Sequence, residues 1–154
     1  MLDKVIEEYK FVRKLSLDLL SRLSPEALPY APLDGMGAFW RQFRHVGRVQ
    51  EDYSRAIESG RVEFSTVKSS YSGGPSQQQL CEYLKQCDEI MFEKLSASPA
   101  NPDLLIDWFG DKVGLTEHMV RLVAHETFHH GQWVIYMQGL GAKMPESWSA
   151  WGFE

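Results

Sequence analysis

The stretch HETFHHGQW, residues 125–133, carries three of the five histidines of this 154-residue chain. At about 100° per residue, His125 and His129 fall on one face of a helix, one turn apart, so both rings can reach a single metal ion. His130 points about 100° away from His129. The sequence leaves two explanations open for the pair: metal ligands, or core histidines whose nitrogen atoms are hydrogen-bonded.

The residues around this stretch predict a buried helix over 116–139, because apolar side chains occupy nearly all of its faces. Apolar side chains spaced by three and four residues predict three more helices. Prolines, Gly60 and the Ser76 N-cap with Gln79 three residues on mark their ends. These three helices cover residues 2–23, from about 35–38 to 59, and 77–96.

Four helices of roughly 20 residues and no convincing strand pattern predict an all-α four-helix bundle, in one domain over residues 1–154. Residues 60–75 are expected to form an exposed loop. The short apolar segment DLLIDWFGDKVGL (103–115) predicts an irregular crossover or a small hairpin before the last helix. The tail GAKMPESWSAWGFE (141–154) is expected to dock on the bundle, because exposed tryptophans are unfavourable.

Composition and charge exclude several classes of protein. The formal net charge is −5 and no Lys/Arg run is present, which disfavours a nucleic-acid partner. A charged, periodic N-terminus is not typical of a signal peptide, and no apolar run approaches the 18 or so residues of a membrane span. Cys81 and Cys87 lie roughly 9 Å apart along a helix, too far for a disulfide. We therefore expect reduced structural thiols in a cytoplasmic protein without a membrane partner.

A third histidine makes a metal site the favoured explanation. His45 lies at the border of the apolar face of the second helix, so a bundle can bring it opposite His125 and His129. Three neutral imidazoles with open coordination positions make a catalytic type of site for Zn²⁺ or Ni²⁺. His118 lies two turns before His125, about 10 Å along the axis, and is not expected to bind the same ion.

These features resemble the DinB/YfiT-like superfamily of metal-binding four-helix proteins, and the resemblance covers nearly the whole chain. Residues 23–60 look like the turn and second helix of that family, with His45 as its histidine. HETFHHGQW is similar to the family signature HxxxHRGQ, with His125 and His129 as the matching pair and His130 in place of the usual arginine. The resemblance implies an up-down-down-up bundle with a three-histidine metal site, often in a homodimer.

The resemblance also implies a function. Characterised members use a divalent metal to activate a low-molecular-weight thiol, so we expect a Zn or Ni ion, a thiol co-substrate and S-transfer to a small molecule. Gln132, Tyr136 and Glu126 are the candidates for proton relay or for support of the histidine rings. Two alternatives stay open: a metal-dependent hydrolase that uses metal-bound water, and a non-catalytic stress protein that binds a metal or another ligand.

Two other features lead to weaker interpretations. HETFH also spells the HExxH of zinc peptidases, in which Glu126 would be the base. A peptidase needs a further ligand downstream, but no histidine follows His130, which disfavours it. The second helix also carries several arginines that predict a solvated face, from which one can reach an anionic thiol cofactor or a dimer partner. They are Arg41, Arg44, Arg48 and Arg55.

Overall fold

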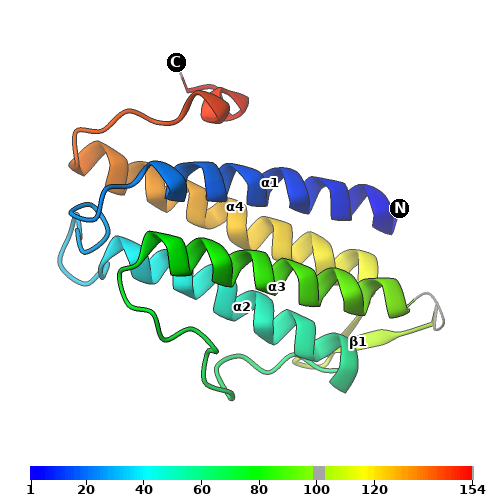
Figure 1. Cartoon of the computed structure of the whole chain (residues 1–154). Coiled ribbons are helices and arrows are strands. Elements are labelled where there is room, and N and C mark those ends of the chain that lie inside the picture. The colour runs from blue at the N-terminus through cyan, green and yellow to red at the C-terminus, as the bar shows by residue number, and fades with distance from the viewer. Residues whose placement is uncertain (99–102, 154) are drawn as a thin grey trace.

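The structure, a computed structural model, describes residues 1–98 and 103–153. Its four long helices begin and end close to the predicted positions, and a small hairpin and a 3-10 helix complete the fold (Figure 1). The helices are α1 (Leu2–Arg22), α2 (Phe39–Ser59), α3 (Gln77–Ala97) and α4 (Leu115–Gly139), the strands are β1 (Leu105–Trp108) and β2 (Asp111–Gly114), and the 3-10 helix is η2 (Glu146–Trp151).

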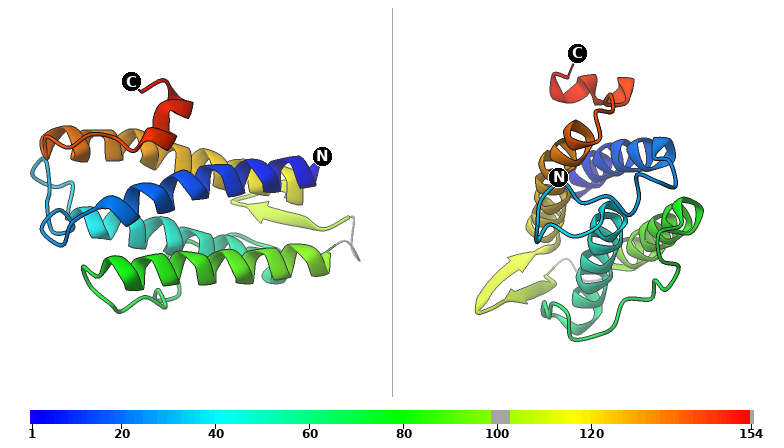
Figure 2. Two further views of the ribbon diagram at one scale, coloured as in Figure 1. Left: turned by 45° about the horizontal axis from the view of Figure 1, so that its top comes forward. Right: turned by 90° about the vertical axis from the view of Figure 1, so that its left-hand side faces the viewer.

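The helices pack side by side as a bundle. In Figure 1, α1 and α4 run from right to left, whereas α2 and α3 run from left to right. A long loop after α2 carries the chain back along the bundle to the start of α3, as both views in Figure 2 show. The main packing partners are α1 with α4 and α2 with α3, while α2 also packs on α4. None of the described helices is long and apolar enough to cross a membrane.

Local signals fix the helix ends. Gly60 ends α2 in the left-handed conformation, with φ of 74°, and its amide donates to the carbonyl of Ala56. The Ser76 hydroxyl caps α3 by accepting from the amide of Gln79 at 3.4 Å. At α4 the N-cap is Gly114, and no side chain caps this end of the helix.

The core forms two clusters along the bundle axis. One, next to the C-terminal tail, is rich in aromatic side chains and includes Phe39, Phe43, Trp133 and Tyr136. The other lies at the hairpin end. Burial of such side chains stabilises the fold by about 1.5–3 kcal/mol each. Helices α2 and α3 approach closely at Gly47, where an added Cβ would lie 2.3 Å from the Tyr83 ring.

The segment before α4 is a regular hairpin, so the expected irregular crossover is wrong and the alternative hairpin is confirmed. Strands β1 and β2 pair antiparallel from Leu105↔Gly114 to Trp108↔Asp111. The two turn residues, Phe109 and Gly110, both have positive φ, 56° and 99°, as a tight hairpin turn requires. Four-residue strands give too short an alternating pattern for sequence to identify.

The C-terminal tail contacts the bundle through its tryptophans. Trp148 is fully buried, and its indole N–H donates to the carbonyl of Leu15 at 3.0 Å. Trp151 is partly exposed and donates to Nδ1 of His130 on α4 at 3.1 Å. The last residue of the predicted tail, Glu154, lies outside the described residues.

Candidate metal centre

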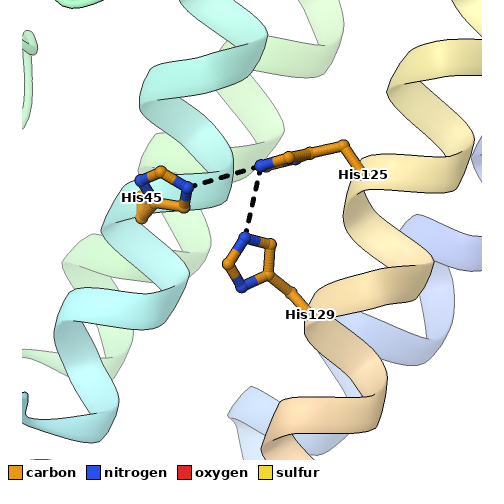
Figure 3. Close-up of side chains that lie close together, drawn as sticks. All are labelled: His45, His125 and His129. Atoms are coloured by element: carbon orange, nitrogen blue, oxygen red, sulfur yellow. Dashed lines mark hydrogen bonds between the residues drawn. The ribbon is translucent and has the colours of Figure 1, made fainter. Parts of the chain in front are cut away.

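Three histidine side chains converge between α2 and α4 (Figure 3). Nε2 of His125 lies 3.3 Å from Nε2 of His45 and 3.2 Å from Nε2 of His129. One potential ligand atom from each of the three rings lies within 4.8 Å of the other two. The structure therefore brings together the three residues predicted as metal ligands, two from one face of α4 and one from α2.

Hydrogen bonding on the far side of one ring fixes which nitrogen faces the cluster. Nδ1 of His129 lies 3.0 Å from Oε1 of Gln42. Because an amide oxygen only accepts, Nδ1 carries the hydrogen and Nε2 presents its lone pair to the other rings. Within the described part of the chain, Nδ1 of His125 is buried without a hydrogen-bond partner. Lone pairs on three neighbouring Nε2 atoms are better satisfied by one shared cation than by contacts among the three rings.

The surroundings keep the three rings uncharged. Burial, together with the neighbouring His45, lowers the pKa of His125 to about 4. Burial lowers the pKa of His129 to about 3, helped by His125 and His45 and opposed by Gln132. The pKa of His45 is lowered by partial burial of its ring and by the charges of two arginines, Arg48 and Arg44. Neutral imidazole is the form that binds a metal, so the donor set fits a divalent ion.

The residue that supports the cluster most directly is Gln42, which was not among the predicted site residues. Its Nε2 donates to the Tyr136 hydroxyl at 3.2 Å, while its Oε1 accepts from His129. The Tyr136 hydroxyl in turn lies 2.9 Å from the carbonyl oxygen of Met36. Tyr136 thus acts on His129 through Gln42. The sequence signal was present, because Gln42 is a polar residue one turn from His45 on the border of an apolar face.

The other two predicted supporting residues differ in position. Gln132 is half-buried one turn beyond His129, close enough to oppose part of the lowering of the pKa of that ring. Glu126 is fully buried and faces α1, where the Arg13 guanidinium lies 3.0 Å from its Oε2 and the Ser16 hydroxyl donates to its Oε1. The structure therefore does not bring Glu126 to the histidine cluster.

The remaining two histidines are buried and have hydrogen-bond partners at both nitrogens. Nδ1 of His130 accepts from the Trp151 indole, so its Nε2 carries a hydrogen and donates to the Ser16 hydroxyl at 2.7 Å. Nδ1 of His118 accepts from the Trp108 indole, and its Nε2 donates to the Tyr53 carbonyl, both at 3.1 Å. Burial lowers the pKa of His130 to about 3 and that of His118 to about 4.

Comparisons with known proteins agree with this arrangement of helices. The sequence model of the DinB family matches residues 1–149. A DinB-like protein from Bacillus subtilis is 16% identical, with a TM-score of 0.72 over 94% of this chain and 97% of that chain. A DinB-like protein from Bacillus cereus is also 16% identical, with a TM-score of 0.75 over 93% and 95%. No curated protein matches. The family match over nearly its whole length shows that the chain belongs to the DinB family.

Proposed function

We propose that this chain is a metal-dependent enzyme that activates a low-molecular-weight thiol for S-transfer to a small-molecule electrophile. The observation that carries the proposal is the convergence of three neutral imidazoles on one point, with His45 exposed at its edge. An exposed ligand leaves one side of the centre open to a substrate. Structural zinc sites, by contrast, are closed by four ligands that usually include thiolates.

His45, His125 and His129 would hold the ion through their Nε2 atoms, with Zn²⁺ or Ni²⁺ as the metals that suit imidazole ligands. When bound, such an ion supplies the positive charge that lowers the pKa of a thiol or a water molecule. Gln42 keeps the His129 ring in the orientation and tautomer that ligation needs. Glu126 is already engaged by Arg13, which argues against it as a base for this reaction.

The thiol would come from outside the chain. Burial raises the pKa of Cys87 to about 12, and burial also raises the pKa of Cys81. Both cysteines lie on α3, whereas the cluster lies between α2 and α4. In the proposed step the sulfur of a small thiol forms a bond to an electrophilic carbon, the leaving group departs with its bonding electrons, and the thiol proton passes to water. Two free cysteines also suit a reducing compartment, which supports a cytoplasmic location.

Metal analysis of untagged protein is the first test. We expect about one divalent ion per chain, abolished by His125→Ala and retained by the control His118→Gln, which removes a histidine outside the cluster. Conjugation of monochlorobimane is then measured across a panel of small thiols with both variants. Metal binding without thiol-dependent turnover would contradict the proposed S-transfer.

A hydrolase is the second candidate, because the exposed edge at His45 admits water as readily as a thiol. Its reaction would need the same ion but no thiol. Release of nitrophenol from small esters, dependent on His125 and independent of added thiol, would favour it. If the metal is present and neither reaction occurs, the binding protein without catalysis becomes the better description.

A second copy of the chain is the proposed partner, through an exposed apolar stripe on α4. Val120, Phe128 and Ile135 are 47%, 67% and 43% exposed, and the small residues Ala124 and Gly131 lie between them on the same face. Helices pack closely where small residues alternate with large ones, so this face suits self-association. Light scattering should give a dimer mass, and Phe128→Glu should give a monomer. A monomeric parent protein would contradict the proposal.

A further inference from the structure

A pocket of about 310 Å³ lies between α2 and the loop that follows it, and three of its five lining residues are cations. The lining consists of Arg44, Arg48, Lys68, Ser69 and Tyr71. The two arginines are one turn apart on α2, and Lys68 faces them from the loop. A chain with a net charge of −5 thus gathers three positive charges around one small space.

Among the described residues, 1–98 and 103–153, no carboxylate forms an ion pair with these three cations. Every ion pair found within residues 1–98 and 103–153 involves a different lysine or arginine. Two carboxylates of α2 accept hydrogen bonds from this loop instead: Glu51 from the amide and hydroxyl of Ser70, and Asp52 from the amide of Ser65. Unpaired cations around a concave space attract an anion, because their combined field is stronger there than on a flat surface.

Two of the cations are held in place by uncharged neighbours. The guanidinium of Arg48 donates to the carbonyl of Val67 at 3.4 Å. The guanidinium of Arg44 lies over the Trp40 ring, 5.2 Å from its centre. Side chains held in this way lose less conformational entropy when a ligand binds. Arginine forks match the two oxygens of a carboxylate or a phosphate.

Two residues of the pocket are neighbours of His45 on α2, and their charges act on its ring. Arg48 is one turn beyond His45 and about 60° around the helix axis, and Arg44 is about 100° around on the same side. His45 is the exposed member of the cluster. An elongated small molecule can therefore lie across the outer face of α2, with one end at the cluster and the other in the pocket.

We propose that the basic pocket formed by Arg44, Arg48 and Lys68 binds an oxyanion group, carboxylate or phosphate, of the same thiol whose sulfur is activated at the histidine cluster. This inference rests on the proposed function, and it narrows the co-substrate to an anionic thiol. A neutral or cationic thiol would bind with only the sulfur end engaged.

The pocket is tested first without any metal. Orthophosphate and succinate are titrated separately into metal-free protein, and the backbone amides of residues 67–71 are followed by NMR. We expect saturable shifts, with Kd increased at least about threefold by Arg44→Gln or Lys68→Gln and about tenfold by the double variant. Lys85→Gln removes an exposed cation on α3 and should leave Kd unchanged. The tighter of the two anions identifies the oxyanion preferred.

The link to the cluster is tested with cobalt-loaded protein, in which thiolate binding gives a near-ultraviolet absorption band. We expect glutathione, which carries two carboxylates, to bind more weakly in the Arg44→Gln/Lys68→Gln double variant, whereas cysteamine, which carries none, is unaffected. An equal effect of Lys85→Gln, or no anion-dependent shift in residues 67–71, would overturn the pocket. Anion binding in the pocket with no cobalt–thiolate band from either thiol would overturn the thiol function alone. If glutathione binds equally well to the double variant and to the parent protein, the link between the pocket and the histidine cluster is overturned.

Discussion

Two groups of side chains leave the same two turns of α4 on faces about 100° apart. His125 and His129 face α2, where their ring nitrogens lie within 3.2 to 3.3 Å of other histidine nitrogens. Glu126 and His130 face α1, where both are hydrogen-bonded to the Ser16 hydroxyl. Both groups are polar and both are in the interior of the bundle. They differ in their partners: Glu126 faces the Arg13 cation, whereas the Nε2 atoms of His125 and His129 face other imidazoles.

The network on the α1 side is a continuous relay of complementary groups. The Trp151 indole donates to His130, His130 to Ser16, and Ser16 to Glu126, which pairs with Arg13. Arg13 continues it to Gln50 on α2 at 2.8 Å and to Asp88 on α3 at 3.6 Å. This network therefore joins all four helices and the tail, and two carboxylates lie beside its buried cation. Within residues 1–98 and 103–153, Nε and Nη1 of Arg13 and Oε2 of Glu126 have these ion pairs around them but form no hydrogen bond. In the cluster on the α2 side the Nε2 atoms of the histidines face one another, which is why it is the candidate metal centre.

The largest effect is expected when one histidine is removed from each group in turn. We expect His125→Ala to weaken Zn²⁺ binding by about a thousandfold or more, roughly 4 kcal/mol, because two ligands remain. His130→Ala should retain the metal and lower the free energy of unfolding instead, since the Trp151 indole loses its acceptor and the Ser16 hydroxyl loses its donor. Competition with a chelating dye measures the affinity. Loss of metal from His130→Ala in a folded protein would show that the two groups are not separate.

Removing the cation from the closed network should be the next largest effect. Arg13→Met leaves the buried Glu126 without its counter-ion, and we expect a loss of about 3 kcal/mol in the free energy of unfolding. The loss is limited because burial already raises the pKa of Glu126, so the carboxyl group can take up a proton. Urea denaturation measures it, with Arg22→Met on the exposed face of α1 as the control. Equal stability of the two variants would mean that the network does not stabilise the fold.

Support of the metal centre from its far side predicts a smaller effect. Gln42→Leu removes the acceptor that orients His129, and we expect metal affinity to fall by about 10- to 100-fold. Gln132→Leu is the matched control, because Gln132 is also near His129 but is not the partner of its Nδ1. Dye competition should show little change for the control. A larger loss from Gln132→Leu would restore that residue as the principal support.

The features that sequence predicted well depend on spacing along one helix. The i, i+4 positions of His125 and His129, the glycine stop at residue 60 and the Ser76 cap are all local. Partners across helices were harder, because they depend on which face meets which neighbour. In the sequence, Arg13 is one of several charged residues of the first helix, and only the fold shows that it pairs with Glu126. The same reason applies to Glu126, which HETFH suggested as the base of a peptidase. The motif does not indicate which neighbouring helix each side chain faces.

The effect that is smallest near neutral pH concerns His118, a histidine with both nitrogens hydrogen-bonded. Its pKa is about 4 in the folded protein and about 6.5 when unfolded, so between these values the unfolded chain binds a proton that the folded chain does not. The free energy of unfolding should therefore fall as pH drops through this window, by about 1.4 kcal/mol per pH unit from this group, with no such dependence above it. His118→Gln should remove that part of the slope. Urea denaturation of metal-free protein at pH 4.5, 5.5, 6.5 and 7.5 measures it, and identical slopes would show that the folded protein accepts a proton on this ring.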